Sequence, residues 1–217
     1  MISVIIPTLD EEARIATLVA ALASHAEVIV ADGGSIDETV NRATQAGATV
    51  IQAPRGRGPQ MHAGVHHAEH DILWFLHADS TPPPNAIHAI RQAIEAGANS
   101  GTFRLRFENA PLMTALYAAL QAIGVTYGDA SLFTRRDVYE ATGGFANLPL
   151  FEDTDLIRRL RRHGRFIRLD AAITTSNRRI ESPVAFVRAW LVWITLQLLY
   201  WLGAPAPQLA RWYRAVR

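Results

Sequence analysis

The stretch Glu27-Val-Ile-Val-Ala-Asp-Gly-Gly-Ser35 joins a run of apolar, mostly β-branched residues to a sharp turn signal. Such a run predicts a buried strand, and the two glycines after Asp32 predict the turn that ends it. Residues 36–46 follow with a helical pattern that stops at Gly47. A strand followed at once by a helix is the unit from which α/β folds are built.

The same unit recurs on both sides of this stretch. Residues 3–6 form a short β-branched run stopped by Pro7, and a helix capped by Thr8 or Asp10 is predicted to follow. Further strands are predicted at residues 49–51 and 72–76. Strands that alternate with helices of this length indicate an α/β fold with a mostly parallel central sheet flanked by helices.

The second half of the chain is less regular. The hydrophobic pattern predicts helices and strands in alternation, but with longer connections between them. The predicted elements are a helix to about residue 96, a strand over 101–107, a helix over 111–123, a strand over 130–133, a helix over 152–162 and a strand over 166–169.

The composition excludes several kinds of chemistry. The chain has 217 residues, its basic residues are all arginine, and it contains neither lysine nor cysteine. A P-loop lysine, a Schiff base, a thiolate nucleophile and a disulfide are therefore impossible. The formal net charge of +1 is the sum of a net −6 over residues 1–100 and a net +7 over residues 101–217. Any phosphate group must be held by arginine, by backbone N–H groups or by a metal ion.

The length suits one domain over residues 1–180, followed by a C-terminal helical segment over residues 181–217. No signal peptide is predicted at the N-terminus, so we expect a cytoplasmic protein. Residues 189–207 carry no charge and are long enough to span a bilayer of about 30 Å. A helix in the plane of the inner membrane face, a homodimer contact or packing against the core are the favoured alternatives.

Polar residues gather where the predicted strands end. Pro7-Thr8, Asp32-Gly33 and His77-Ala-Asp79 each follow a strand, and ligands of parallel sheets bind at the carboxyl ends of the strands. Asp32 could accept a hydrogen bond from a nucleobase or ribose, or simply close a tight turn. His77 and Asp79 could hold one divalent cation, or begin an Asx turn.

Two further segments are candidates for anion binding and for metal binding. Arg55-Gly-Arg-Gly-Pro59 could hold a phosphate group at the start of a helix, or could be a solvated turn. His62, His66 and His70 recur at helical spacing, but without the H-E-x-x-H pattern of zinc enzymes, so we expect surface histidines.

The segment Phe151-Glu-Asp-Thr-Asp155 places three carboxylates at a predicted helix N-terminus. The helix dipole favours their ionised form there, which suits a general base or an electrostatic anchor. An ordinary acidic first turn is the alternative, because acidic residues are common at this position.

Taken in order, these motifs resemble those of family 2 glycosyltransferases of the GT-A fold, over roughly residues 2–180. Ser3–Glu12 resembles the family's opening strand and its P-T-x-N-E sequence, with Asp10 in place of Asn, and Val30–Asp37 resembles its nucleobase-binding stretch. His77-Ala-Asp79 corresponds to the D-x-D metal motif, and Glu152-Asp153 is similar to the E-D catalytic motif. The acceptor-side segment of the family is matched by Gly128-Asp129, followed by Phe133, Arg135, Arg136 and Gly143–Phe145. The sequences of three segments also resemble those of a small bacterial subgroup linked by name to arsenosugar biosynthesis: Gly56–Met61, Phe75–Asp79 and Thr175–Arg179.

The resemblance implies inverting transfer of a sugar from a nucleotide diphosphate sugar to an acceptor hydroxyl, with no nucleic acid as partner. It implies catalysis by Asp153 with Glu152, and a Mn²⁺ or Mg²⁺ ion held by Asp79 and His77. The residues that it implies for nucleotide-sugar binding are Pro7, Thr8, Glu11, Asp32, Gly33, Arg57, Gly58, Asp129, Arg178 and Arg179.

Two other classes of function stay open at this point. A sugar nucleotidylyltransferase has a related fold, but would need a glycine-rich loop near the N-terminus followed by a lysine. A non-catalytic protein could bind a nucleotide sugar, or a membrane partner through its apolar C-terminal helix. Replacement of the first Asp of D-x-D by His77 changes the ligand set that the family offers to a metal.

Overall fold

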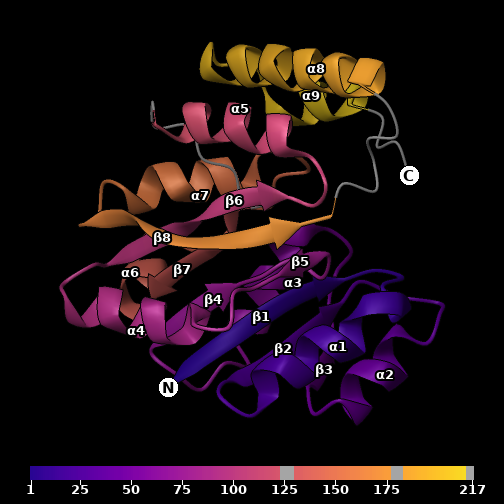
Figure 1. Cartoon of the computed structure of the whole chain (residues 1–217), viewed down its shortest axis with the longest axis vertical. Helices are drawn as coiled ribbons and strands as arrows, with labels where there is room; N and C mark the ends of the chain where they lie inside the picture. Colours follow the sequence, from indigo (N-terminus) through magenta and orange to yellow (C-terminus); the bar gives the residue numbers. More distant parts are fainter. Residues whose placement is uncertain (123–129, 177–182, 214–217) are drawn as a thin grey trace.

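The computed structural model describes residues 1–122, 130–176 and 183–213 (Figure 1). Its N-terminal half alternates strands and helices as the sequence predicts. The elements are β1 (Ile2–Thr8), α1 (Glu12–Ala23), β2 (Glu27–Asp32), α2 (Thr39–Gln45), β3 (Thr49–Gln52), α3 (Arg57–Val65) and β4 (Ile72–Phe75). The cap of α1 was wrongly predicted, because its N-cap is Glu11, while the Asp10 carboxylate accepts a hydrogen bond from the Ile36 N–H at 2.9 Å.

The second half adds short strands and more helices. The elements are β5 (Ser80–Thr81), α4 (Ala86–Glu95), β6 (Ser100–Phe107), α5 (Pro111–Ala122), β7 (Leu132–Arg135), α6 (Arg136–Ala141), α7 (Glu152–Leu160), β8 (Phe166–Thr175), α8 (Pro183–Trp201) and α9 (Ala206–Trp212). The sequence patterns did not predict β5 and α6, which are both short.

The strands of the described residues all join one sheet, in the order β3-β2-β1-β4-β7-β6-β8-β5. The strands β3, β2, β1 and β4 are parallel, but β7 runs antiparallel to both β4 and β6, and β5 runs antiparallel to β8. The sheet is therefore mixed, and the prediction of a mostly parallel sheet is not confirmed. The reason is that residue periodicity identifies a strand without giving its direction.

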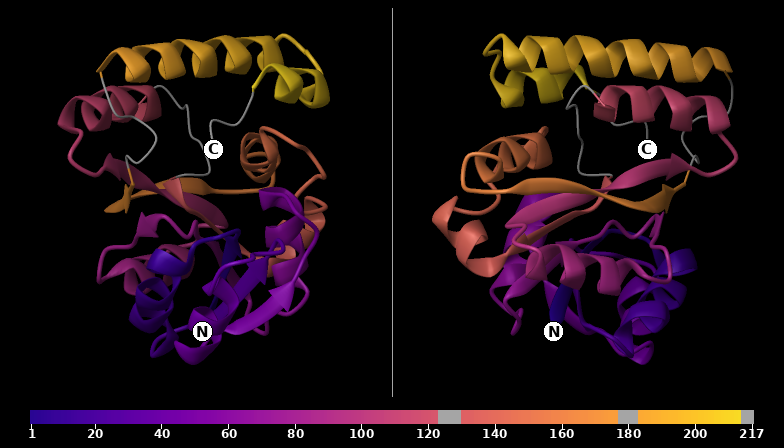
Figure 2. Two further views of the ribbon diagram at one scale, coloured as in Figure 1. Left: turned by 90° about the vertical axis from the view of Figure 1, so that its right-hand side faces the viewer. Right: turned by 60° about the vertical axis from the view of Figure 1, so that its left-hand side comes forward.

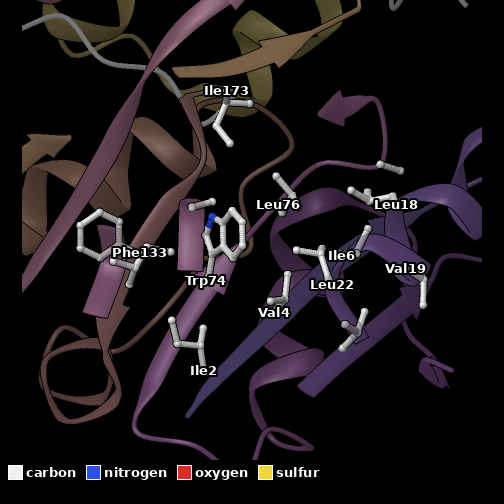
Figure 3. Packing of buried hydrophobic residues seen from close by; sticks show 14 of the residues in the cluster. Ile2, Val4, Ile6, Leu18, Val19, Leu22, Trp74, Leu76, Phe133 and Ile173 are labelled. Atoms are coloured by element: carbon white, nitrogen blue, oxygen red, sulfur yellow. The ribbon is translucent and has the colours of Figure 1, made fainter. Parts of the chain in front are cut away.

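Alternate residues of β1 face the two sides of the sheet, because side chains of a strand alternate. Ile2, Val4 and Ile6 pack into one apolar cluster with residues of α1, α2 and α4 (Figure 3). Ile5 packs into a second cluster with residues of α3, α6 and α7. A Cβ at Gly64 of α3 would collide with the Ile5 side chain, so this glycine lets α3 approach the sheet closely.

The C-terminal helices α8 and α9 form an outer layer beyond α5 and α7 (Figures 1 and 2). They share a third apolar cluster with the segment before α7, in which Leu150, Phe151, Leu196 and Leu209 are buried. None of the described helices has both the length and the hydropathy needed to cross a bilayer.

Candidate active site

The sequence-predicted strand-end residues lie at one edge of the sheet. Thr8 pairs with Asp32 at the carboxyl ends of β1 and β2. Phe75 pairs with Ile5, and the Leu76 N–H donates to the Ile5 carbonyl at 3.0 Å, so the chain leaves β4 alongside the end of β1. Pro7, Thr8, Asp32, Gly33 and the segment from His77 to Asp79 therefore share this edge.

The Asp32 carboxylate is buried and already holds the turn that follows it. Its Oδ2 accepts from the N–H groups of Gly34 and Ser35, each at 2.9 Å. Its Oδ1 accepts from the Ser35 hydroxyl at 2.5 Å and from the Thr8 hydroxyl at 3.2 Å. Since a carboxylate offers about four acceptor sites, the tight-turn alternative describes what this side chain does in the structure.

Gln60 is a residue of this site that sequence reasoning missed. Its side chain is 4% exposed, and its Nε2 donates to the carbonyls of Thr8 and Ala31, each at 2.7 Å. A Cβ at Gly33 would lie 3.1 Å from the Gln60 amide. Gln60 thus joins α3 to the ends of β1 and β2. The one sequence feature that could have indicated Gln60 is its position: it is a glutamine beside the apolar face of a helix that follows a glycine-rich turn.

The first turn of α3 reaches the opposite side of the site. Arg57 Nε and Glu152 Oε1 form an ion pair at 2.9 Å, and the Glu152 side chain is only 3% exposed. A Cβ at Gly58 would lie 3.2 Å from the Glu152 Cβ and 3.3 Å from the Ala146 carbonyl oxygen. Gly58 therefore lets the N-termini of α3 and α7 approach each other. Arg57 begins α3 with its side chain 41% exposed, and phosphate binding by this segment stays a prediction.

Burial raises the pKa of the Glu152 carboxyl, and the charge of Asp153 adds to this rise. Arg57 opposes the rise most strongly, and His77 also opposes it. The printed contacts between these parts of the chain run through α3, because Gln60 bonds to the ends of β1 and β2 and Arg57 pairs with Glu152 at the start of α7. The strand ends and the E-D motif, which are far apart in the sequence, are therefore linked by one helix.

Asp153 is half-buried at the start of α7, where its Oδ1 accepts from the Thr154 N–H at 2.6 Å. Glu11 is half-buried at the start of α1, and its N–H donates to the Thr39 hydroxyl at 2.8 Å. Asp129, Arg178 and Arg179, which the resemblance also implies for donor binding, lie outside the described residues.

Asp79 and His77 are both half-buried, and they can supply one carboxylate and one imidazole. In the described part of the chain, no group of three or more His, Asp or Glu side chains is arranged to hold a metal ion. Two protein ligands fit a Mg²⁺ or Mn²⁺ ion that takes its other ligands from substrate phosphates and water. They do not fit a metal enclosed by protein alone.

Among the histidines in and after α3, His62 takes part in contacts between α3 and α6. The helix ends at Val65, so His70 lies beyond it, while the rings of His62 and His66 are 5.0 Å apart. His62 Nδ1 is 2.8 Å from the buried hydroxyl of Tyr139, in a pocket of about 360 Å³ between α3 and α6. The Arg136 guanidinium in this pocket bonds to backbone carbonyls, so these polar groups join α3 to α6.

Comparisons with known proteins find relatives of this chain in sequence and in fold. The family model described as Glycosyl transferase family 2 matches residues 3–146. Uncharacterised glycosyltransferases of Mycobacterium bovis and Mycobacterium tuberculosis are each 31% identical over 106 residues, which is 48% of this chain and 49% of each relative. The chain spans about half the length of the curated relatives that it matches. None of these matches confirms the arsenosugar subgroup.

Solved structures of glucosyl-3-phosphoglycerate synthase from Mycobacterium tuberculosis share the fold. The complex with Mn²⁺, UDP and glucosyl-3-phosphoglycerate has a TM-score of 0.66 and 22% identity, over 94% of this chain and 81% of that chain. The complex with Mg²⁺ and UDP has a TM-score of 0.67 and 21% identity, over 94% and 80%. At this level of identity the likeness establishes an α/β fold of the GT-A type.

Proposed function

The chain belongs to glycosyltransferase family 2, and we propose that it transfers a sugar from a nucleotide diphosphate donor to an acceptor hydroxyl, with inversion at the anomeric carbon. The observation that carries this proposal is the double link made by α3: Gln60 bonds to the ends of β1 and β2, and Arg57 pairs with the buried Glu152 at the start of α7. This link supports one site that combines the strand ends, as the proposed nucleotide-binding edge, with the acidic start of α7. A nucleotidylyltransferase would lack its lysine here, since the chain has none.

The nucleoside is proposed to bind at Pro7, Thr8, Glu11, Asp32 and Gly33. A base or ribose group that donates to Asp32 would replace the Ser35 hydroxyl, because that contact can be lost without breaking the backbone bonds of the turn. Arg57 and Gly58, with Asp129, Arg178 and Arg179, complete the proposed donor site. Arginine and helix N–H groups suit a diphosphate.

Asp79 and His77 are proposed to hold the divalent cation. A bound Mn²⁺ or Mg²⁺ would offset the negative charge of the diphosphate as the leaving group departs. Among the solved synthase structures that share this fold, some contain Mn²⁺ or Mg²⁺ with UDP, and three contain Mn²⁺ with UDP-glucose. We therefore propose a UDP-sugar as the first donor to test.

Asp153 is proposed to be the general base. Its carboxylate would accept the proton of the acceptor hydroxyl while the hydroxyl oxygen forms a bond to the anomeric carbon. The bond from that carbon to the diphosphate oxygen breaks, and the nucleoside diphosphate leaves with the electron pair. The buried Glu152, paired with Arg57, fixes the start of α7 and so the direction of its neighbour Asp153.

Donor binding can be tested by thermal shift with UDP-, GDP- and dTDP-sugars, each with and without Mn²⁺. A donor at 100 times its Kd should stabilise the protein by about 2.7 kcal/mol. We expect one donor class to raise the Tm in a Mn²⁺-dependent way, and Asp79→Ala to remove the dependence on Mn²⁺. Asp71→Ala, at an exposed position, is the control. If no donor shifts the Tm of the wild-type protein, the proposal is wrong.

The outward face of α8 and α9 is proposed to contact an anionic membrane surface. Its exposed residues are Leu191, Val192, Leu198, Trp201, Leu202 and Trp212. Four arginines and no acidic residue follow Glu181, so this segment complements anionic lipid, whereas two copies of it would repel each other. A homodimer through this face is the alternative that a binding test distinguishes.

A further inference from the structure

Phe151, immediately before the proposed catalytic pair, has an unusual backbone conformation. Its φ is 66° and its ψ is 20°, in the left-handed region, and its side chain is buried. The other described non-glycine residues with positive φ are Asp10, Asn109 and Ser131, which are short and polar. For a bulky residue this conformation is strained, and it persists only where the surroundings impose it.

The surroundings that impose it come from the C-terminal helix α8. The Phe151 ring stacks on the Tyr200 ring at 4.6 Å between centroids, with an angle of 23°. The Trp193 ring meets Phe151 edge-on at 6.1 Å and is braced by Tyr213 at 5.0 Å. Among the described residues, this apolar cluster takes only Leu150 and Phe151 from outside residues 183–213.

Phe151 is also the residue that starts α7. It is the N-cap, and its carbonyl accepts the Asp155 N–H at 2.9 Å, which is the first bond of the helix. Its neighbours Glu152 and Asp153 follow directly, so a change in the Phe151 backbone would turn both carboxylates. The stack of the Tyr200 ring on the Phe151 ring places Tyr200 beside this turn, and burial, with the charge of Asp155, raises the pKa of its phenol.

We propose that Trp193 and Tyr200 are positioning residues for Glu152 and Asp153, and that they act by clamping the Phe151 ring. This inference rests on the proposed function for its catalytic consequence, but the mechanical link can be measured without it. The Gln197 amide of α8 is buried without a partner in the described structure. A buried amide without a partner opposes docking of the helix, because the lost hydrogen bonds to water are not replaced. The ring contacts with Phe151 offset this cost and hold α8 against the start of α7.

Hydrogen exchange of the segment 150–156 tests the clamp in the full chain. Tyr200→Leu should raise exchange in this segment at least fivefold and leave peptides of β1 and α3 unchanged. Tyr200→Phe keeps the stacked ring and should match the wild type within twofold. Thr195→Ala, on the exposed side of the same helix, should also match it. Gln197→Leu removes the orphaned amide and should lower exchange in the same segment.

The catalytic consequence is measured separately. Tyr200→Leu should lower kcat on the order of 10-fold to 100-fold, with the donor KM unchanged, because a displaced base affects the chemical step. Unchanged exchange at 150–156, or an equal rise in every peptide, would overturn the clamp. A local rise in exchange in a protein that transfers no sugar would support the clamp and reject the proposed function instead.

Discussion

The Arg57–Glu152 ion pair joins a residue of the acidic half of the chain to one of the basic half. Glu152 is almost fully buried, whereas the Arg57 side chain is 41% exposed. The sequence indicated both residues as site candidates, but not their contact, because hydrophobic patterns say nothing about which charged side chains meet across a fold. The same limit explains Gln60, whose partners are backbone carbonyls that only the folded sheet brings together.

Removal of Arg57 should make the free energy of unfolding more dependent on pH, because the buried Glu152 carboxylate would lose its partner. The folded-state pKa of Glu152 lies above its ordinary value of 4.5, because burial disfavours the carboxylate. The folded state therefore holds this proton more tightly than the unfolded chain does, and the free energy of unfolding falls as the pH rises from 4.5 through the folded pKa. Arg57→Ala should raise the folded pKa further and widen this interval.

We therefore expect Arg57→Ala to lose about 1–3 kcal/mol of unfolding free energy at pH 7, toward the lower end because Arg57 is partly exposed. Below pH 4.5 both states carry the proton, so the loss should shrink toward zero. Tm measurements from pH 4 to pH 8 check this. Arg55→Ala, at an exposed neighbour, should show neither effect. A loss that is independent of pH, or that persists in Glu152→Gln, would contradict the assignment.

At the scale of elements, the sequence predicted most strands and helices because their apolar residues repeat with the period of each structure. The antiparallel direction of β7 and the short α6 were not predictable in this way, since direction depends on the connections and six residues hold too little pattern. The turn after β2 was predictable, because Asp32 and two glycines have strong local preferences.

The C-terminal helix α8 had three possible roles on the sequence alone: contact with a membrane, contact with a second copy, or packing against the core. We expect the protein to bind vesicles that contain phosphatidylglycerol and to bind pure phosphatidylcholine vesicles weakly, because four arginines and no acidic residue follow Glu181 in the sequence. The double variant Leu198→Gln/Trp201→Gln should bind anionic vesicles at least about tenfold more weakly, since each large apolar side chain contributes about 1.5–3 kcal/mol when buried.

Ile36→Gln is the matched control for vesicle binding, because Ile36 is 95% exposed but lies in the N-terminal half. It should bind as the wild type does. If the wild type ignores anionic vesicles, and instead forms a dimer that the double variant loses, the α8 face is a contact between copies and the membrane proposal is wrong.

At the scale of the whole molecule, α3 connects the two halves of the proposed site. Gln60 ties this helix to the ends of β1 and β2, and Arg57 ties it to the start of α7. The near-neutral net charge thus conceals an acidic half that carries the strand ends and a basic half that carries Glu152 and Asp153. The order of motifs along the sequence was enough to predict the family, while the clamp of α8 on Phe151 required the folded chain.

Asp153 is proposed to act as the base in transfer of a sugar by this chain. The most direct test compares turnover of the wild-type protein, Asp153→Asn and Asp170→Asn with the donor that gives the thermal shift. Asp170 is a suitable control because its side chain is 92% exposed. We predict that Asp153→Asn lowers kcat by roughly 10²–10⁴-fold and keeps the donor-induced shift in Tm, while Asp170→Asn changes neither. Turnover by Asp153→Asn at the wild-type rate would contradict the account.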